Sequence, residues 1–362
     1  MAVGTFGDTP IRVGLIGYGL GGAVFHAPLI TATDGMRLVA VVTGDAGRGA
    51  AAAQRYPDVR ILPSADDLWT SAGDLDLVVV STVNRAHVPL ALAAFDAGLS
   101  IVMDKPLAPT AADGQRLIDA ARDNGLFLSV FQNRRWDSDF LTLRALLAEH
   151  AIGTPTRFES RYERWRPDLD ADAWRESAGA QDAGGLLFDL GSHLIDQAMQ
   201  LFGRPRSVYA ELDGRRAGAV VDDDAFVALT HPNGMRSHLW MSAVARLQGP
   251  RFRVLGMGGA FESSGLDGQE DTLAAGGDPR DPGWGTEPKD RWATLATEDG
   301  ERRVKSRLGN YPAYYVGVAE SLRTGAPPPV DPGDSVDGLR VIEAAAHSAA
   351  EHVVVSMEWA DA

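Results

Sequence analysis

The chain of 362 residues contains no cysteine, which excludes disulfide bonds, thiolate metal sites and cysteine nucleophiles together. Long apolar runs are also missing: charged residues or glycines interrupt every window of about 18 residues, so no transmembrane helix is expected. The N-terminus lacks a charged segment followed by an apolar core, which argues against a secretory signal. These absences predict a soluble cytoplasmic protein with no membrane partner.

Basic residues are in the minority. Lys and Arg number 34 against 49 Asp and Glu, which gives a net charge of −15. A chain this acidic repels phosphate backbones, and it carries no long basic run, so nucleic acid is not expected as a partner. The hydrophobic content of 45% supports sizeable cores, and the length favours about two domains.

The first third of the chain alternates between strand-like and helix-like patterns. The run LDLVVV at residues 75–80 is nearly all apolar, as expected for a strand buried on both faces. This alternation predicts a parallel sheet with right-handed crossovers, and hence a doubly wound, Rossmann-type dinucleotide-binding domain over residues 1–132. Strands are expected at 11–16, 37–42, 75–80, 99–103 and 126–131, and helices at 22–33, 46–56, 86–97 and 111–123.

Residues 133–362 have a different texture and predict an α+β domain for substrate binding and oligomerisation. Pro232-Asn233-Gly234 indicates a tight hairpin turn, so the sheet is expected to be open and mainly antiparallel. Residues 265–290, rich in Gly, Asp and Pro, suggest a long surface loop. Extended segments are expected at 155–165, 207–212, 225–230, 235–243 and 252–263, and helices at 136–150, 311–323 and 335–352.

An open sheet leaves one face uncovered, and a second copy of the chain is the usual cover. Trp240 and Met241 lie on a candidate strand and would suit such a face. We therefore expect a homodimer or a homotetramer.

The segment from Gly17 to Gly22 fits the pattern G-x-G-x-x-G between a strand and a helix. Gly17 allows the tight turn, Gly19 lets a pyrophosphate approach the backbone, and Gly22 lets helix and strand pack closely. We expect this turn, including Leu20, to bind a dinucleotide. The alternative is a glycine-rich turn without a ligand.

The end of the second strand bears on the choice of cofactor. NAD enzymes usually place an acidic residue here to hold the ribose hydroxyls, but this chain has Thr43. A small hydroxyl residue with Arg48 nearby suits a 2′-phosphate and favours NADP over NAD. Alternatively, Asp45 bends back to serve NAD and Arg48 is a solvated helix residue.

Two further motifs carry candidate catalytic groups. Lys105, in Asp104-Lys105-Pro106, follows a strand at the sheet edge where ligands bind, and can stabilise an alkoxide. Asp189 and His193 lie four residues apart on one helix face, and a histidine can accept a hydroxyl proton. Each motif has a plain alternative, a salt bridge for the lysine and a surface pair for the helix. Asp196 extends the helix face, but no metal site is expected.

Together these motifs resemble the Gfo/Idh/MocA oxidoreductase family over essentially the whole chain. The residues that carry the resemblance are GYGLGG at 17–22, Asn84 to His87, DKP at 104–106 and GGLLFDLGSH at 184–193. Asp104 departs from the family's usual glutamate. The segments VFHAPLI, FQNRRWDSDFLTL, GGLLFDLGSHLIDQAMQLFG and GDPRDPGWG are most similar to a branch of NADP-dependent scyllo-inositol dehydrogenase-like oxidoreductases.

The resemblance implies hydride transfer between NADP, with NAD possible, and a cyclic polyol or sugar such as scyllo-inositol. In this reading Lys105, Asp189 and His193 form the catalytic set. Another sugar or dihydrodiol dehydrogenase, a nicotinamide-dependent glycosidase and a non-catalytic nucleotide sensor remain the alternatives. The resemblance further implies cofactor contacts from Thr82, Asn84, His87 and Asp104, and substrate contacts from Asn133, Trp136 and Tyr162.

Three of the implied positions have plainer interpretations. His87 is alternatively a solvated residue at the start of a helix, and Trp136 is alternatively part of a core. His26, in the segment FHAP, is expected to pack in the interior, although a lid over the cofactor is an alternative.

Overall fold

The computed structural model describes residues 9–170, 176 and 182–359, so the two ends of the predicted domain division at 1 and 362 lie outside the described residues. The described chain forms two compact units. The first contains the residues up to Asn133 together with Gln269–Trp284 and Asn310–Val336. The second contains Arg134–Gly268, Gly285–Gly309 and the residues from Asp337 onward. The division into domains at 1–132 and 133–362 stays a prediction.

The first unit is built on a six-stranded sheet in the order β3-β2-β1-β4-β5-β6. All its pairs are parallel, which confirms the doubly wound fold predicted from sequence. Only β3 was not predicted, because its three half-exposed residues carry no apolar pattern. The strands are β1 Ile11–Ile16, β2 Met36–Val42, β3 Arg60–Leu62, β4 Leu77–Val80, β5 Ser100–Met103 and β6 Leu128–Val130.

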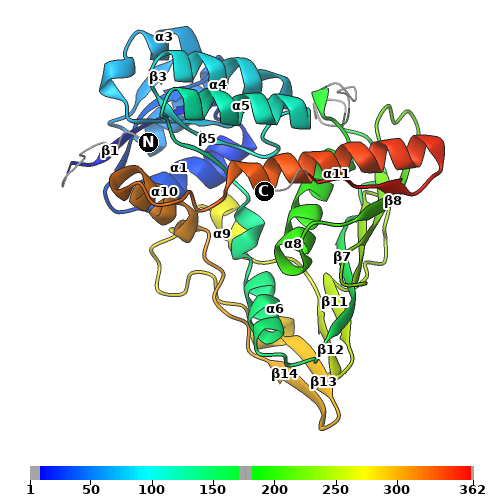
Figure 1. Cartoon of the computed structure of the whole chain (residues 1–362). Coiled ribbons are helices and arrows are strands. Elements are labelled where there is room, and N and C mark those ends of the chain that lie inside the picture. The colour runs from blue at the N-terminus through cyan, green and yellow to red at the C-terminus, as the bar shows by residue number, and fades with distance from the viewer. Residues whose placement is uncertain (1–8, 171–175, 177–181, 360–362) are drawn as a thin grey trace. The chain divides into compact units, whose positions relative to one another are not determined.

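Helices cover both faces of this sheet. Figure 1 shows α4 and α5 side by side on one face and α1 on the other. Local sequence starts several helices, because the side chains of Asp45, Ser64 and Thr110 accept hydrogen bonds from backbone N–H groups of the first turn. The segments are η1 Gly21–His26 (a π-helical turn), α1 Ala27–Ala32, α2 Ala46–Arg55, α3 Ala65–Trp69, η2 Ala72–Asp74, η3 Asn84–Ala86, α4 His87–Asp96 and α5 Ala111–Asp123.

Two helices from late in the chain also belong to the first unit, α9 (Gln269–Ala274) and α10 (Pro312–Thr324). The expectation of a long surface loop over residues 265–290 is therefore wrong for residues 269–274, whereas residues 275–288 contain no helix or strand. Gln269 is buried, and its Oε1 accepts hydrogen bonds from Trp284 Nε1 at 2.9 Å and from the Tyr311 N–H at 2.8 Å. A helix of six residues is too short to show a helical period against a background of Gly, Asp and Pro.

The second unit contains a nine-stranded sheet in the order β14-β13-β12-β11-β7-β10-β9-β8-β15. It is mainly antiparallel, as predicted, although β7 and β10 pair in parallel. The single extended segment expected at 252–263 is two strands, because the chain reverses at Met257-Gly258. The strands are β7 Pro155–Glu163, β8 Ser207–Asp213, β9 Asp224–Thr230, β10 Arg236–Ser242, β11 Phe252–Gly256, β12 Gly259–Ser263, β13 Ala293–Thr297, β14 Gly300–Val304 and β15 Val355–Ser356.

Helices pack on one face of this sheet and build its core. The Phe158 ring lies 5.4 Å from that of Phe202 and 5.7 Å from that of Phe252, and Phe140 reaches Phe252 at 6.3 Å. The predicted hairpin turn is confirmed, with Gly234 at a φ of +83°. The helical segments of this part of the chain are η4 Asn133–Trp136, α6 Ser138–Ala148, η6 Leu187–Gly191 (π-helical), α8 Ser192–Phe202, η7 Lys289–Arg291 and α11 Pro332–Glu351, which enters this unit at Asp337.

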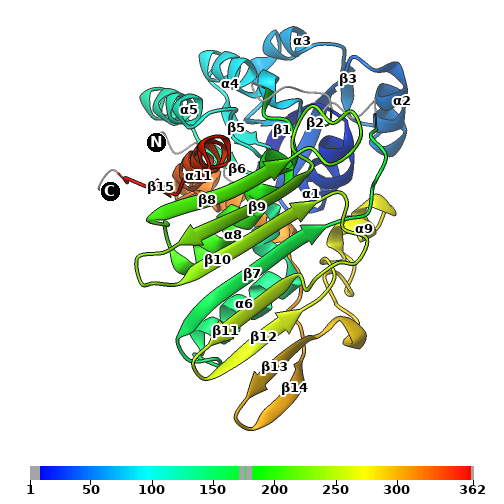
Figure 2. The same cartoon turned by 90° about the vertical axis from the view of Figure 1, so that its right-hand side faces the viewer.

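The opposite face of the nine-stranded sheet is turned to the viewer in Figure 2. Trp240 lies on this face, with its ring 5.2 Å from that of Phe226 and 5.9 Å from that of His238. Met241 is fully buried on the helix side, 3.3 Å from where a side chain at Gly191 would begin. The expectation that Trp240 and Met241 share the open face is therefore wrong, since neighbouring residues of a strand point to opposite faces. Among the described residues, no helix is long and apolar enough to cross a membrane.

Candidate active site

The glycine turn after β1 has the geometry of a phosphate cradle. Gly17 has a φ of +97°, and a Cβ there would lie 2.0 Å from the carbonyl oxygen of Ser81. A Cβ at Gly22 would lie 2.0 Å from the carbonyl oxygen of Gly17. At Gly19, by contrast, the nearest atom to such a Cβ is Arg48 Nη1, at 3.8 Å. Gly17 and Gly22 are thus required by packing, whereas the backbone at Gly19 is open to a phosphate group, as dinucleotide binding requires.

The helix after this turn presents its positive end to the same place. It runs from Gly21 through His26 into α1, and the N-terminal end of such a helix favours an anion. Leu20, at the mouth of the turn, is 62% exposed. An apolar side chain exposed in this position fits a surface that a cofactor covers.

At the end of β2, Asp45 and Arg48, the two charged residues that bear on cofactor choice, point to different places. Asp45 Oδ1 accepts the Arg48 N–H at 2.8 Å and thereby caps α2. The Thr43 hydroxyl oxygen accepts the Asp45 N–H at 3.3 Å. The Arg48 guanidinium reaches back toward Gly19. The carboxylate at this strand end therefore holds a helix, while the cation faces the phosphate turn.

The segment after β4 carries Thr82, Asn84 and His87. Asn84 is buried at the start of η3, and the His87 side chain is fully buried. His87 Nδ1 lies 2.9 Å from the carbonyl oxygen of Pro106, and its Nε2 lies 3.3 Å from that of Thr82. The solvated alternative for His87 is therefore wrong. The ring links the end of β4 to the turn that follows Lys105.

Asp104 and Lys105 follow β5 directly. Asp104 Oδ2 accepts the Ser81 hydroxyl at 2.8 Å, and its Oδ1 accepts the Lys105 N–H at 2.8 Å. His26 Nε2 faces the same carboxylate at 3.4 Å. Burial opposes ionisation of Asp104, but His26 and the Ser81 hydroxyl outweigh it, so the pKa of Asp104 lies below its ordinary value. Asp104 is thus a half-buried, charged anchor for the Lys105 backbone.

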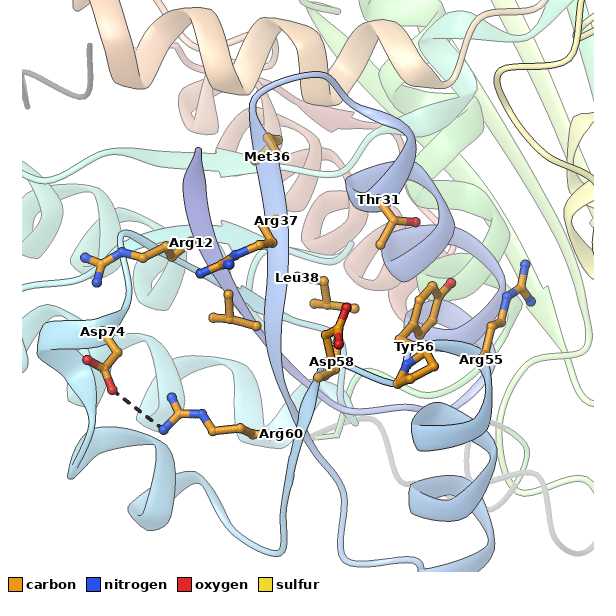
Figure 3. Close-up of a pocket in the computed structure, with 13 residues that line it drawn as sticks. Arg12, Thr31, Met36, Arg37, Leu38, Arg55, Tyr56, Asp58, Arg60 and Asp74 are labelled. Atoms are coloured by element: carbon orange, nitrogen blue, oxygen red, sulfur yellow. Dashed lines mark ion pairs between the residues drawn. The ribbon is translucent and has the colours of Figure 1, made fainter. Parts of the chain in front are cut away.

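A hollow of about 850 Å³ lies elsewhere in the first unit, along the N-terminal half of β2 (Figure 3). Four arginines line it, and one of them, Arg60, pairs with Asp74 at 3.6 Å. None of the predicted site residues lines this hollow. It lies at the end of β2 away from the carboxyl ends of the strands, where ligands bind in such sheets, so we do not assign it to the reaction.

In the second unit, Asp189 lies on η6 and His193 on the first turn of α8, where His193 is 6% exposed. Asp222 fixes the start of this segment. Its Oδ2 accepts the Leu187 N–H at 2.7 Å. Gly185 has a φ of +90°, and a Cβ there would lie 2.1 Å from Asp222 Oδ1, so only glycine fits.

Asp196, on the same helix, is committed to an ion pair. Arg135 holds it with two hydrogen bonds, at 2.9 and 2.5 Å, and both side chains are buried. A carboxylate neutralised in this way is poorly placed to bind a metal. Within the described ranges, no group of three or more His, Cys, Asp or Glu side chains has the arrangement of a metal site.

Tyr162 is 1% exposed, and its hydroxyl oxygen accepts hydrogen bonds from Arg134 and Arg164, both at 2.9 Å. Contacts along the neighbouring helix show where this residue lies. Phe202, at the end of α8, packs on Phe158 of β7.

One turn earlier on α8, Gln197 is joined to Ser160 of β7 through Arg251, which donates to both side chains at 2.7 and 2.6 Å. α8 and β7 therefore run in opposite directions. Tyr162, two residues beyond Ser160 on the same face, lies toward the His193 end of α8. Trp136 is half-buried in η4 of this unit, and Asn133 is buried at the end of the first.

Several residues of these arrangements were not predicted. Ser81, Tyr315, Asp222 and Arg164 act through contacts with residues distant in sequence, and no local pattern marks them. His26 has a local signal in the segment FHAP, and its expected packing agrees with its complete burial. No local pattern indicates its polar partners, Tyr315 and Asp104.

Replacing Asp222 by asparagine is expected to change how stability depends on pH. Burial raises the pKa of Asp222 to about 6, although the hydrogen bond from the Leu187 N–H lowers it. Ionisation of Asp222 is therefore disfavoured in the folded chain. The protonated Asp222 carboxyl stabilises the fold fully below its ordinary pKa, and this stabilisation is lost as pH rises through its pKa in the folded chain. Between about pH 4 and about pH 8, the wild type should lose roughly 2 kcal/mol of unfolding free energy relative to Asp222→Asn.

Urea unfolding of both proteins at each pH measures this difference. Asparagine keeps an acceptor oxygen for the Leu187 N–H, so the comparison isolates the charge. The control Asp58→Asn changes an exposed carboxylate and should show no such trend. A difference between wild type and Asp222→Asn that stays constant with pH would contradict the assignment.

Comparison with known proteins agrees with both units. Residues 11–132 match the model of the oxidoreductase family, NAD-binding Rossmann fold, and residues 144–357 match that of its C-terminal alpha/beta domain. The chain is 36% identical over 352 residues to the scyllo-inositol 2-dehydrogenase (NADP(+)) IolW of Bacillus subtilis, covering 96% of each chain. It is 38% identical over 343 residues to the oxidoreductase YdgJ of Escherichia coli, covering 94% of this chain and 96% of that one.

The structure of the oxidoreductase yvaA from Bacillus subtilis superposes with a TM-score of 0.91 at 35% identity, covering 97% of this chain and 99% of that one. The glycine turn, the paired family models and these full-length similarities lead to one assignment. The chain belongs to the Gfo/Idh/MocA oxidoreductase family and is an NAD(P)-dependent oxidoreductase with an NAD-binding Rossmann domain.

Proposed function

We propose that the protein is an NADP-dependent dehydrogenase of a cyclic polyol or sugar, with scyllo-inositol and scyllo-inosose as the substrate pair. The observation that carries the proposal is that Lys105, Asp189 and His193 occur together in a chain similar over its length to a scyllo-inositol 2-dehydrogenase. A nucleotide sensor of the same fold has no need for all three groups. A different sugar or a dihydrodiol is the second candidate.

In the proposed reaction the bound nicotinamide supplies the hydride acceptor. His193 accepts the proton of the reacting hydroxyl group. Lys105 donates a hydrogen bond to the same oxygen and stabilises its developing negative charge. Asp189 orients His193 or a neighbouring hydroxyl of the substrate. In the reverse direction the same groups protonate the oxygen of a ketone.

The proposed cofactor contacts follow the carboxyl edge of the parallel sheet. The glycine turn and the exposed Leu20 would hold the pyrophosphate side, and residues after β4 and β5 would line the nicotinamide side. The residues we assign to the cofactor are Gly17, Gly19, Leu20, Gly22, Thr43, Arg48, Thr82, Asn84, His87 and Asp104. In the second unit, Trp136 and Tyr162 would contact the substrate, as would Asn133 of the first.

We favour NADP over NAD on the arrangement after β2. Asp45, the carboxylate available for ribose hydroxyls, already caps α2, whereas Arg48 reaches toward the phosphate turn. A guanidinium in this place suits a 2′-phosphate, since it binds phosphate oxygens through paired N–H groups.

We further propose that the chain forms a homodimer or homotetramer through the open face of the nine-stranded sheet. Phe226, His238 and Trp240 form a cluster of rings there, and an uncovered sheet face with aromatic side chains favours burial against a copy. In this proposal, residues 133–362 form the substrate and oligomerisation domain and residues 1–132 the cofactor domain.

Substituting the proposed catalytic groups should abolish turnover without abolishing cofactor binding. Absorbance of reduced cofactor, with NADP⁺ and NAD⁺ in parallel, is followed against scyllo-inositol, myo-inositol, glucose and xylose. We expect NADP⁺ reduction by scyllo-inositol. Lys105→Met and His193→Asn should each lower kcat by about 100-fold or more, because each removes a proton-handling or charge-stabilising group.

The matched controls Lys289→Met and His347→Asn make the same changes at exposed positions and should keep the wild-type rate. NADPH affinity, measured by fluorescence, should change little in all four variants. Near-native turnover of Lys105→Met or His193→Asn would refute the role of that residue. Reduction of cofactor by glucose or xylose alone would favour the second candidate.

Removing Arg48 should lower the preference for NADP⁺. A charged hydrogen bond of this kind is worth about 1.5–3 kcal/mol, so Arg48→Ala should reduce the ratio of kcat/KM for NADP⁺ to that for NAD⁺ by about 10- to 100-fold. Arg55→Ala, at the other end of α2, is the control. An unchanged ratio, or a wild type that prefers NAD⁺, would transfer the role to Asp45.

A charge on the open sheet face should break the assembly. Trp240→Glu places a carboxylate among Phe226 and His238, which a buried interface does not tolerate. We expect sedimentation velocity to show a smaller species than for the wild type. Val316→Glu, at an exposed apolar position of α10, is the control. A monomeric wild type, or an assembly unaffected by Trp240→Glu, would contradict this interface.

A further inference from the structure

A chain of polar contacts in the first unit leads from α10 to the backbone of Lys105. His26, at the end of η1, is fully buried. Its Nδ1 lies 2.6 Å from the Tyr315 hydroxyl oxygen, and its Nε2 faces Asp104 Oδ2 at 3.4 Å. The ring packs 4.5 Å from that of Phe131, which holds it in place. The role of these contacts depends on which of the two His26 nitrogens carries a proton and on whether the Tyr315 hydroxyl donates or accepts.

The position of the protons follows from the surroundings of Tyr315. This side chain is fully buried, and burial raises the pKa of its hydroxyl well above the ordinary value, so the phenol keeps its proton. Among the described residues, its hydroxyl has a single polar contact, with His26 Nδ1. Because a buried donor needs an acceptor, the hydroxyl donates to Nδ1. The proton of a neutral His26 ring is then on Nε2, which faces Asp104.

The Asp104 carboxylate connects His26 to the backbone of Lys105. One carboxylate oxygen faces His26 and accepts the Ser81 hydroxyl, and the other accepts the Lys105 N–H. The phosphate helix closes on the same group, since a Cβ at Gly21 would lie 2.4 Å from Ser81 Oγ and 2.7 Å from Asp104 Oδ2. The carboxylate therefore has little room to turn.

We propose that His26 and Tyr315 are positioning residues that fix Lys105 through Asp104. Without the Nε2–H of His26, the Asp104 carboxylate would lose the partner that draws it into the interior. The Ser81 hydroxyl alone would then hold that oxygen, and the Lys105 backbone, whose N–H the other carboxylate oxygen accepts, would lose its fixed place, which would shift the Lys105 side chain away from the substrate oxygen. The inference rests on the catalytic role of Lys105 in the proposed function. It gives a role to the hydrogen bond between a buried histidine and a buried tyrosine that are 289 residues apart in the sequence.

The test compares two neighbouring tyrosines of α10. Tyr315→Phe removes the hydroxyl that fixes His26 and keeps the ring. Tyr314→Phe is the matched control, because Tyr314 is also fully buried and its hydroxyl bonds Ser129 instead. Since a small misplacement of a reacting group costs up to about 100-fold, Tyr315→Phe should lower kcat by about 10-fold or more. Its KM for NADP⁺ and its melting temperature should match those of Tyr314→Phe.

Substitutions of His26 give an independent readout. Glutamine offers an N–H donor near the place of Nε2, whereas leucine offers none, so His26→Gln should retain several-fold more kcat than His26→Leu. Equal kcat values for Tyr315→Phe and Tyr314→Phe would overturn the proposal. A loss in Tyr315→Phe that appears in KM for NADP⁺ and in melting temperature as much as in kcat would also overturn it, since a purely structural role gives that result.

The proposal can fail separately from the proposed function. If the wild type oxidises none of the polyols, the function fails, and the contacts are judged by ¹⁵N NMR of His26 in the wild type and in Tyr315→Phe. We expect the proton on Nε2 in the wild type, and a change in this signature when the hydroxyl is removed. A ring protonated at Nδ1, or a signature unaffected by Tyr315→Phe, would overturn the positioning role.

Discussion

The close approach of the turn after β1 to the end of β4 is the constraint on which the first unit's site depends. The Ser81 N–H donates to the Ile16 carbonyl at 2.8 Å, and the Asp104 N–H donates to the Val80 carbonyl at 2.9 Å, so three strand ends are held at one edge. A side chain at Gly17 would separate them, because its Cβ would lie 2.0 Å from the Ser81 carbonyl oxygen. The same approach brings the Ser81 hydroxyl against Asp104 and closes the phosphate helix over both. The phosphate cradle and the backbone that carries Lys105 are thus parts of one packed structure.

The second unit fixes its polar groups by a different means. Here a carboxylate outside the helix, Asp222, accepts the Leu187 N–H at the start of η6, and an ion pair of Arg135 with Asp196 holds the face of α8 further along. Buried charges are costly unless they are paired, and breaking such a pair costs about 3–5 kcal/mol. The helix that carries His193 is therefore held at both ends of the stretch from residue 187 to residue 196. Its position does not depend on the hydrophobic packing of Phe202 alone.

What the sequence predicted well was local. Strand β1 has the bounds that its mostly apolar run predicted, β4 at 77–80 is the apolar part of the run expected at 75–80, and the glycine turn has the backbone geometry that its spacing predicts. What it missed depends on contacts between distant residues. The helix at 269–274 is stabilised by Trp284 and Tyr311, and Met241 faces inward because η6 covers that side of its strand. The alternative of a solvated His87 fails for the same reason, because the ring is buried against the carbonyl oxygens of Pro106 and Thr82. No pattern within a short window contains these partners.

The difference between local patterns and contacts of distant residues also applies to the cofactor and the substrate. Cofactor preference depends on few atoms near one strand end, and there Asp45 has two competing uses. Turning to a ribose would cost α2 its cap, worth about 1 kcal/mol, while Arg48 faces the glycine turn without such a conflict. In the proposed substrate site, by contrast, side chains are positioned by others, as Tyr162 is held by Arg134 and Arg164. Under the proposed function, supporting contacts of this kind, rather than the catalytic groups, would therefore set the preference for one polyol.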